Sequence, residues 1–160
     1  MIEVKNLTKR FGQNTAVDNI SFTVKKGEVL GFLGPNGAGK STTMRMITGY
    51  LPPTEGYVTI DGADVVNEPI VAKAKIGYLP EAAPLYADMT VVAFLRFIAE
   101  LRGKGDADVE CALDTCFLEP VRNQNIDTLS KGYRHRTCLA QSILHDPDIL
   151  ILDEPTEGIQ

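Results

Sequence analysis

The sequence predicts an α/β fold, on three observations. Apolar and polar residues alternate along 2–7 and 20–24, which is the period of half-buried strands. Apolar residues recur at helical spacing along 91–101. Between these regions, an apolar run at 29–33 leads directly into a glycine-rich loop. We therefore expect a β-rich N-terminal part and a helical middle part.

Length and composition limit the possible classes of protein. The chain has 160 residues, of which 44% are hydrophobic, enough to form the core of one domain. The net charge of −5 and the lack of a long Lys/Arg run argue against a nucleic-acid partner. No apolar run approaches the roughly 18 residues of a membrane span, which favours a cytoplasmic location. Cys111, Cys116 and Cys138 form no CxxC pair, so we expect reduced, packed thiols.

Each element has a local signal. After the strands at 2–7 and 20–24, a turn at 26–27 precedes a buried strand at 29–33. A helix at 42–48 then stops at Gly49. The later elements are predicted from apolar periods, caps and turn residues: a strand at 57–60 with a tight turn at 61–62, an interior strand at 76–80, a helix at 91–101 capped by Thr90, a helix at 107–117, a helix from Ser130, and a buried strand at 149–152.

The glycine-rich loop has the pattern of a phosphate-binding loop. Its glycines allow positive φ, which turns backbone N–H groups towards an anion at the start of a helix. Lys40 supplies a charge for the β- and γ-phosphates, and the Ser41 hydroxyl can ligate Mg²⁺. The loop therefore predicts a site for a nucleoside triphosphate, formed by Gly34, Pro35, Asn36, Gly37, Ala38, Gly39, Lys40, Ser41 and Thr42.

An acidic pair follows the last apolar run, 149–152. Acids that leave a buried parallel strand lie at the edge of the sheet where ligands bind. Asp153 is therefore predicted to hold Mg²⁺ and Glu154 to act as the general base towards water. Taken alone, the pattern would also suit an ordinary capped strand end.

A third motif, Leu-Ser-Lys-Gly-Tyr at 129–133, opens the predicted helix from Ser130. A serine followed by glycine at a helix start offers a hydroxyl and free N–H groups to an anion. Taken alone, Ser130 could equally be a simple N-cap.

Together and in this order, the three motifs resemble those of the nucleotide-binding domain of ATP-binding cassette (ABC) proteins, in particular the ABC-2, drug-efflux and gliding-motility types. The family signature usually reads Leu-Ser-Gly-Gly-Gln, so Lys131 and Tyr133 depart from it. The resemblance implies that two such domains pack head to tail. The signature residues Ser130, Lys131, Gly132 and Tyr133 would then face the nucleotide of the other domain, with Ser130 and Gly132 at its γ-phosphate.

The resemblance also places residues outside these motifs. Phe11 matches the aromatic that stacks on adenine, with Val17 nearby, although a hairpin aromatic would also suit that position. Glu81 stands where the family has a glutamine that contacts the metal, and the resemblance implies that its carboxylate coordinates Mg²⁺ together with Ser41 and Asp153. Gln160 stands where the family has an aspartate. The family's switch histidine would come after residue 160. By this resemblance, 1–160 is a C-terminally truncated ABC ATPase domain.

The expected architecture is a P-loop NTPase core with an N-terminal antiparallel β subdomain and an inserted α-helical subdomain at 84–135. The resemblance implies a subunit that binds ATP and Mg²⁺ and hydrolyses ATP to power transport through separate membrane permease subunits. It would lie on the inner face of the cell membrane, and the short chain is expected to be inactive alone. Alternatives are a soluble ABC-type ATPase, such as a translation factor, or another P-loop NTPase such as a kinase or GTPase.

Overall fold

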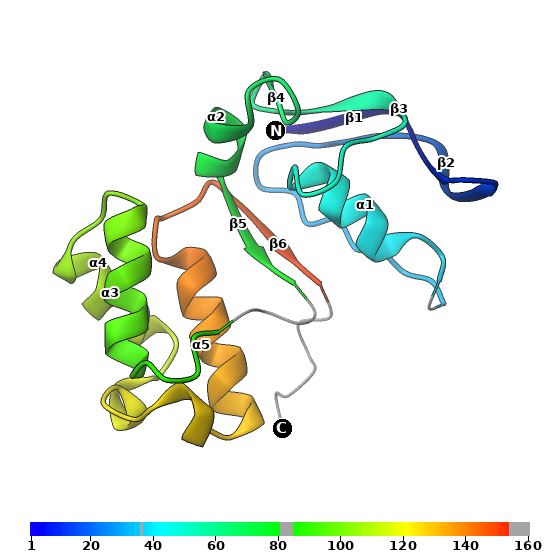
Figure 1. Ribbon diagram of the computed structural model, residues 1–160. Coiled ribbons are helices and arrows are strands. Elements are labelled where there is room, and N and C mark those ends of the chain that lie inside the picture. Colours follow the sequence, from blue (N-terminus) through cyan, green and yellow to red (C-terminus); the bar gives the residue numbers. More distant parts are fainter. Residues whose placement is uncertain (36, 81–84, 154–160) are drawn as a thin grey trace. The chain divides into compact units, whose positions relative to one another are not determined.

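The computed structural model describes residues 1–35, 37–80 and 85–153 (Figure 1). The chain divides into two compact units, Met1–Ile76 and Gly77–Gln160. In its described residues, the first unit contains an antiparallel sheet and two helices. The described part of the second unit contains three α-helices, two 3₁₀ turns and a two-stranded sheet, whose first strand begins at the boundary residue Ile76.

The sheet of the first unit has the order β2-β1-β3-β4, with every neighbouring pair antiparallel. Its inward side chains include Val4, Leu7, Val58 and Ile60, which are all buried. The strands predicted at 2–7, 20–24 and 57–60 are confirmed, and each is longer than predicted: β1 is Ile2–Phe11, β2 is Asn14–Val24, β3 is Glu55–Ile60, and the short β4 is Ala63–Asp64.

Two helices accompany this sheet. The predicted helix after the glycine-rich loop is confirmed as α1, Lys40–Ile47, which buries Thr43, Met46 and Ile47. The chain turns away at Gly49, which has a φ of 77°. Helix α2, Pro69–Ala74, was not predicted because six residues contain too little of a helical period to be recognised.

The predicted buried strand at 29–33 is wrong. This segment has no strand structure, and its side chains at Val29 and Leu33 are 98% and 96% exposed. A buried strand needs hydrogen-bonded neighbours. The sheets found in the described residues are β2-β1-β3-β4 and β5-β6, and neither includes this segment. Its apolar sequence is therefore unpaired here.

The two-stranded sheet consists of β5, Ile76–Leu79, and β6, Ile149–Leu152. Figure 1 shows the two arrows running in the same direction, and the Asp153 N–H donates to the Leu79 carbonyl oxygen at 2.9 Å. Strand β5 is mostly buried, as predicted. The prediction that 149–152 is buried is wrong, because Leu150 is 43% exposed and the other three residues are only partly buried. Strand β5 of the same two-stranded sheet is covered and β6 is not, so an apolar run by itself does not determine burial.

The helices of the second unit follow the predictions closely. Helix α3 is Val91–Leu101, and the Thr90 hydroxyl caps it by accepting the Ala93 N–H at 3.2 Å. Helix α4 is Asp106–Thr115 and α5 is Lys131–Ile143, with Ser130 as its cap. Between α4 and α5 lie the 3₁₀ turns η1, Glu119–Val121, and η2, Ile126–Thr128.

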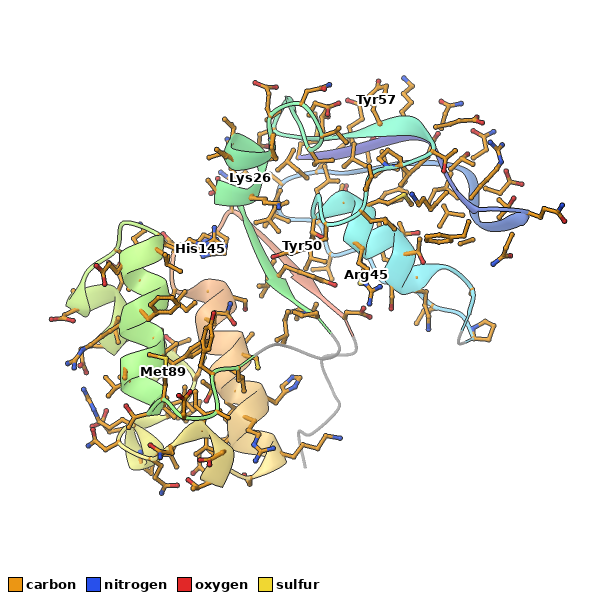
Figure 2. The ribbon with its side chains drawn as sticks, in the orientation of Figure 1. Lys26, Arg45, Tyr50, Tyr57, Met89 and His145 are labelled. Atoms are coloured by element: carbon orange, nitrogen blue, oxygen red, sulfur yellow. The ribbon has the colours of Figure 1, made fainter. Side chains whose placement is uncertain are left out.

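These helices enclose one apolar core, which includes Phe94, Leu95, Leu113 and Leu118. Met89, labelled in Figure 2, packs against it. Within the ranges that the structure covers, no helix is both long and apolar enough to cross a membrane. The division of the chain into a core and a helical insertion at 84–135 stays a prediction.

The three cysteines are free thiols. Cys111 is exposed, whereas Cys116 and Cys138 are buried. Burial raises the pKa of each buried thiol to about 11, against an ordinary value of 9.0. The expectation of packed thiols is therefore confirmed for two cysteines and wrong for Cys111, which lies on a helix face away from the core.

Candidate functional site

The glycine-rich loop forms a tight turn immediately before α1. The Ala38 N–H donates to the Pro35 carbonyl oxygen at 3.2 Å, which closes the turn. Gly37 and Gly39 have φ values of 85° and 93°, in the region that glycine adopts most easily. Gly39 is the N-cap of α1, so the loop leads straight into a helix N-terminus, as predicted.

Gly39 also touches strand β2. A Cβ atom at this position would lie 2.4 Å from the Ala16 carbonyl oxygen and 3.3 Å from Cγ2 of Val17. The first distance is far inside van der Waals contact. The end of the loop therefore packs directly against the backbone of β2, and only glycine fits at position 39. Val17 is buried beneath this contact.

Lys40 reaches back across the loop. Its Nζ donates to the Gly34 carbonyl oxygen at 2.6 Å, so the ammonium group lies over the turn. The first N–H groups of a helix have no intrahelical acceptor, and the helix dipole makes that end positive. The first turn of α1 contains no acidic residue to neutralise it. Ammonium, N–H groups and dipole together fit a bound phosphate chain, with the partly exposed Ser41 and Thr42 beside it.

Phe11 lies at the end of the β1–β2 hairpin, opposite Asn14. Its ring is 49% exposed, and Lys9 Nζ lies 5.2 Å from the ring centroid. An exposed aromatic face can stack on a planar ligand. The proposed contact with adenine stays a prediction.

The remaining predicted residues belong to the second unit. Asp153 follows β6, is 5% exposed, and is joined to β5 through its backbone N–H. Ser130 caps α5 by accepting the Tyr133 N–H at 3.3 Å. The Tyr133 ring packs against the helical core, and the Arg136 guanidinium lies 5.0 Å from its centroid. Lys131 is exposed, whereas Gly132 is only partly exposed.

Several predicted residues lie outside the described part of the chain. They are Asn36 in the loop, Glu81, the general-base candidate Glu154, and Gln160. Among the described residues there is no group of three or more His, Cys, Asp or Glu side chains arranged to hold a metal. The prediction that Ser41, Glu81 and Asp153 ligate Mg²⁺ is not tested by the described residues and stays a prediction.

Sequence reasoning missed Arg134. Its Nε donates to the Ile126 carbonyl oxygen at 3.3 Å, and its Nη2 donates to that of Asp127 at 2.6 Å. These contacts join α5 to the turn η2, which ends two residues before Ser130. The only sequence signal was a cation near the start of a helix, where the dipole disfavours positive charge.

Comparisons with known proteins agree with this geometry. The profile of the ABC transporter family matches residues 17–157, and the chain belongs to this family. It is 42% identical over 163 residues to the probable multidrug ABC transporter ATP-binding protein YbhF of Escherichia coli, covering 99% of this chain and 28% of YbhF. It is 40% identical to the linearmycin resistance ATP-binding protein LnrL of Bacillus subtilis, covering 99% of this chain and 52% of LnrL. The chain thus spans about half or less of these two relatives.

Solved structures give the same result. The ATP-binding subunit of an ABC transporter superposes with a TM-score of 0.89 at 30% identity, covering 98% of this chain and 67% of that one. A dimeric post-hydrolysis state of the ATP-binding cassette MJ0796, bound to ADP and Pi, superposes with a TM-score of 0.89 at 27% identity, covering 99% and 75%. The predicted fold class is confirmed.

Proposed function

We propose that this chain binds and hydrolyses ATP as the ATP-binding part of an ABC transporter. The observation that carries the proposal is the loop before α1. Its glycine is seated on β2, and Lys40 Nζ lies over the turn at 2.6 Å from the Gly34 oxygen. This arrangement suits the phosphates of a nucleotide. Family membership and the relatives named as ATP-binding proteins support the choice of ATP.

The chain's own residues would divide the chemistry among them. Lys40 would hold the β- and γ-phosphates by charge, and the Ser41 hydroxyl and the Asp153 carboxylate would be ligands for Mg²⁺. Glu154 takes a proton from the attacking water. Bound Mg²⁺ would neutralise charge that develops on the phosphate oxygens. Phe11 offers its exposed ring to the base.

The signature residues would act on the nucleotide of a second copy. Ser130 presents its hydroxyl at the start of α5, a helix of 13 residues with no acid in its first turn. This positive end suits an anion. The similar protein solved with ADP and Pi is a dimer, which supports pairing of two copies. Lys131 would add a charge there that the usual glycine lacks.

The membrane partner would be a separate permease. Tyr86, Phe97 and Leu101 are exposed large apolar side chains beside the helical core. The Tyr86 ring contacts the Phe97 ring edge to face, with centroids 5.7 Å apart. Exposed apolar patches of this kind mark partner surfaces. Docking there would place the protein on the inner face of the membrane.

The isolated 160-residue chain should turn over ATP slowly. Val29 and Leu33 are almost fully exposed, so the segment leading into the phosphate loop is not anchored in a sheet. An unanchored loop holds its N–H groups less firmly for the transition state. Full turnover by this chain at concentrations where no dimer forms would contradict this part of the proposal.

The test is a titration of Mg-ATP against the Lys40→Ala variant. Loss of a charge-assisted contact costs about 1.5–3 kcal/mol, so ATP affinity should fall at least about tenfold. Lys26→Ala is the matched control, since Lys26 is an exposed lysine in a turn of the same unit (Figure 2). Equal affinity in the wild type and the Lys40→Ala variant would reject the phosphate loop.

A further inference from the structure

One side chain ties α5 to the turn that precedes it. Arg134 donates from Nε to the Ile126 oxygen at 3.3 Å and from Nη2 to the Asp127 oxygen at 2.6 Å. Both carbonyl groups belong to η2, which ends two residues before Ser130. A planar guanidinium can serve two neighbouring acceptors at once, and its charge strengthens both bonds. A lysine could form only one of these bonds well.

The main chain completes a ring around Ser130. The Leu129 N–H donates to the Ile126 oxygen at 3.2 Å, and the Arg134 N–H donates to the Ser130 oxygen at 2.9 Å. The Arg134 side chain then returns to the same Ile126 oxygen. Ser130 is thus held between η2 and the first turn of α5.

The orientation of the Ser130 hydroxyl follows from this ring. Its oxygen already accepts the Tyr133 N–H at 3.3 Å. A hydroxyl has one hydrogen to donate besides its acceptor sites, so that hydrogen is left for an external acceptor. Any shift of η2 against α5 would move this hydroxyl, because Ser130 connects the two.

The turn η2, to which Arg134 donates, is itself held by backbone hydrogen bonds to the segment before α3. The Ile126 N–H donates to the Met89 oxygen at 2.9 Å, and the Asp127 N–H donates to the Ala87 oxygen at 3.1 Å. Met89 lies inside the helical unit in Figure 2. Arg134 therefore connects α5 to an anchored backbone.

A role limited to stabilising α5 explains Arg134 poorly. A cation near a helix N-terminus opposes the helix dipole. The ion pairs found in the described parts of the chain do not include Arg134. Its charge is instead directed to the carbonyl oxygens of η2.

We propose that Arg134 is a positioning residue, which holds the Ser130 hydroxyl where it can donate to the nucleotide of a second copy. This inference rests on the proposed function, because it assigns a role within the same ATP site. Arg134 does not itself touch the nucleotide in this proposal. It acts through Ser130.

The test compares Arg134→Met, Arg134→Lys and Ser130→Ala in the full-length protein, with Arg96→Met as the control. Arg96 pairs with Asp106 at 3.4 Å between two exposed side chains, a type of contact that contributes little. Arg134→Met should lower turnover at saturating ATP about tenfold, and Arg134→Lys about threefold. Binding of ATP to the phosphate loop, measured as affinity and number of sites, should not change.

The double variant Ser130→Ala/Arg134→Met separates positioning from other roles. If Arg134 acts through Ser130, the double variant should be no slower than Ser130→Ala alone, because coupled residues are not additive. The proposal would be overturned if the double variant lost turnover by the product of the two single-variant losses. It would also be overturned if Arg134→Met kept wild-type turnover, or if it lost ATP-binding sites in the same proportion as turnover. If Arg134→Met does not fold, the same comparisons apply to Arg134→Lys.

Failure of the inference and failure of the proposed function give different results. If Ser130→Ala slows turnover and the Arg134 variants do not, only the role of Arg134 is rejected. If the wild-type protein neither binds nor hydrolyses ATP, the proposed function is rejected and the inference with it.

Discussion

Replacing Gly39 by alanine tests the close contact between the phosphate loop and strand β2. Gly39 has a φ of 93°, and the new Cβ would lie 2.4 Å from the Ala16 carbonyl oxygen. Positive φ costs a non-glycine residue about 1–2 kcal/mol. Forcing an extra carbon into a packed contact adds about 1–3 kcal/mol. The expected loss of unfolding free energy is therefore about 2–5 kcal/mol.

The matched controls are Gly37→Ala and Gly12→Ala. Both glycines have positive φ, of 85° and 59°, but a Cβ at either position meets no atom within 4 Å. These variants should lose only about 1–2 kcal/mol from backbone strain. The assay is urea unfolding followed by circular dichroism, with Mg-ATP affinity measured on the folded fraction. If Gly39→Ala is no less stable than Gly37→Ala, the close approach of the loop to β2 does not constrain the protein.

Three further predictions concern the cysteines and strand β5. In native protein at pH 8, a thiol alkylating agent should label Cys111 and leave Cys116 and Cys138 unlabelled until the protein unfolds. Mass spectrometry of the peptides measures which cysteines are labelled. Rapid labelling of Cys138 would contradict its burial. Burial raises the pKa of each buried thiol from 9.0 to about 11, so the stability that these protonated thiols contribute should be fully present below pH 9. The free energy of unfolding should then fall as the pH rises from 9 towards 11. If this fall is absent from the Cys116→Ala/Cys138→Ala variant, the two thiols are its cause. Gly77→Ala should destabilise the protein, because the new Cβ would lie 2.2 Å from the Ser142 carbonyl oxygen. Gly105→Ala should not, because a Cβ at that position meets no atom within 4 Å. Equal melting temperatures of the Gly77→Ala and Gly105→Ala variants would refute the contact.

Elements with strong local signals were predictable from the sequence. Helix α3 has both an apolar helical period and a capping threonine, Thr90. The β3–β4 hairpin turns at Asp61-Gly62, where both residues have positive φ, as such turns require. The start of α5 was predicted from Ser130. In each case, neighbours in sequence determine the conformation.

Features that depend on distant partners were not predictable in the same way. The apolar run at 29–33 has the composition of a buried strand, but burial depends on strands that pair with it. The contact of Gly39 with Ala16 depends on how the loop meets β2. The bonds of Arg134 go to backbone carbonyl groups, which any residue supplies, so no residue type in the sequence marks the acceptors.

The conformation of the glycine-rich loop was predicted better than the strand leading to it. The glycine pattern predicted the position of the loop, and Gly37 and Gly39 do adopt positive φ directly before the helix that starts at Lys40. The departures from the family signature at Lys131 and Tyr133 were visible in the sequence. The stacking of Arg136 on Tyr133 was not, because i, i+3 neighbours on a helix can point in several directions.

The most direct test of the account is ATP hydrolysis by the full-length protein and its Glu154→Gln variant. Phosphate release and sizing chromatography are measured with Mg-ATP. An amide cannot accept the proton of the attacking water, so the variant should bind ATP, lose most turnover and accumulate as an ATP-bound dimer. Wild-type turnover in Glu154→Gln, or the same monomer with and without ATP, would contradict an ATPase site shared between two copies.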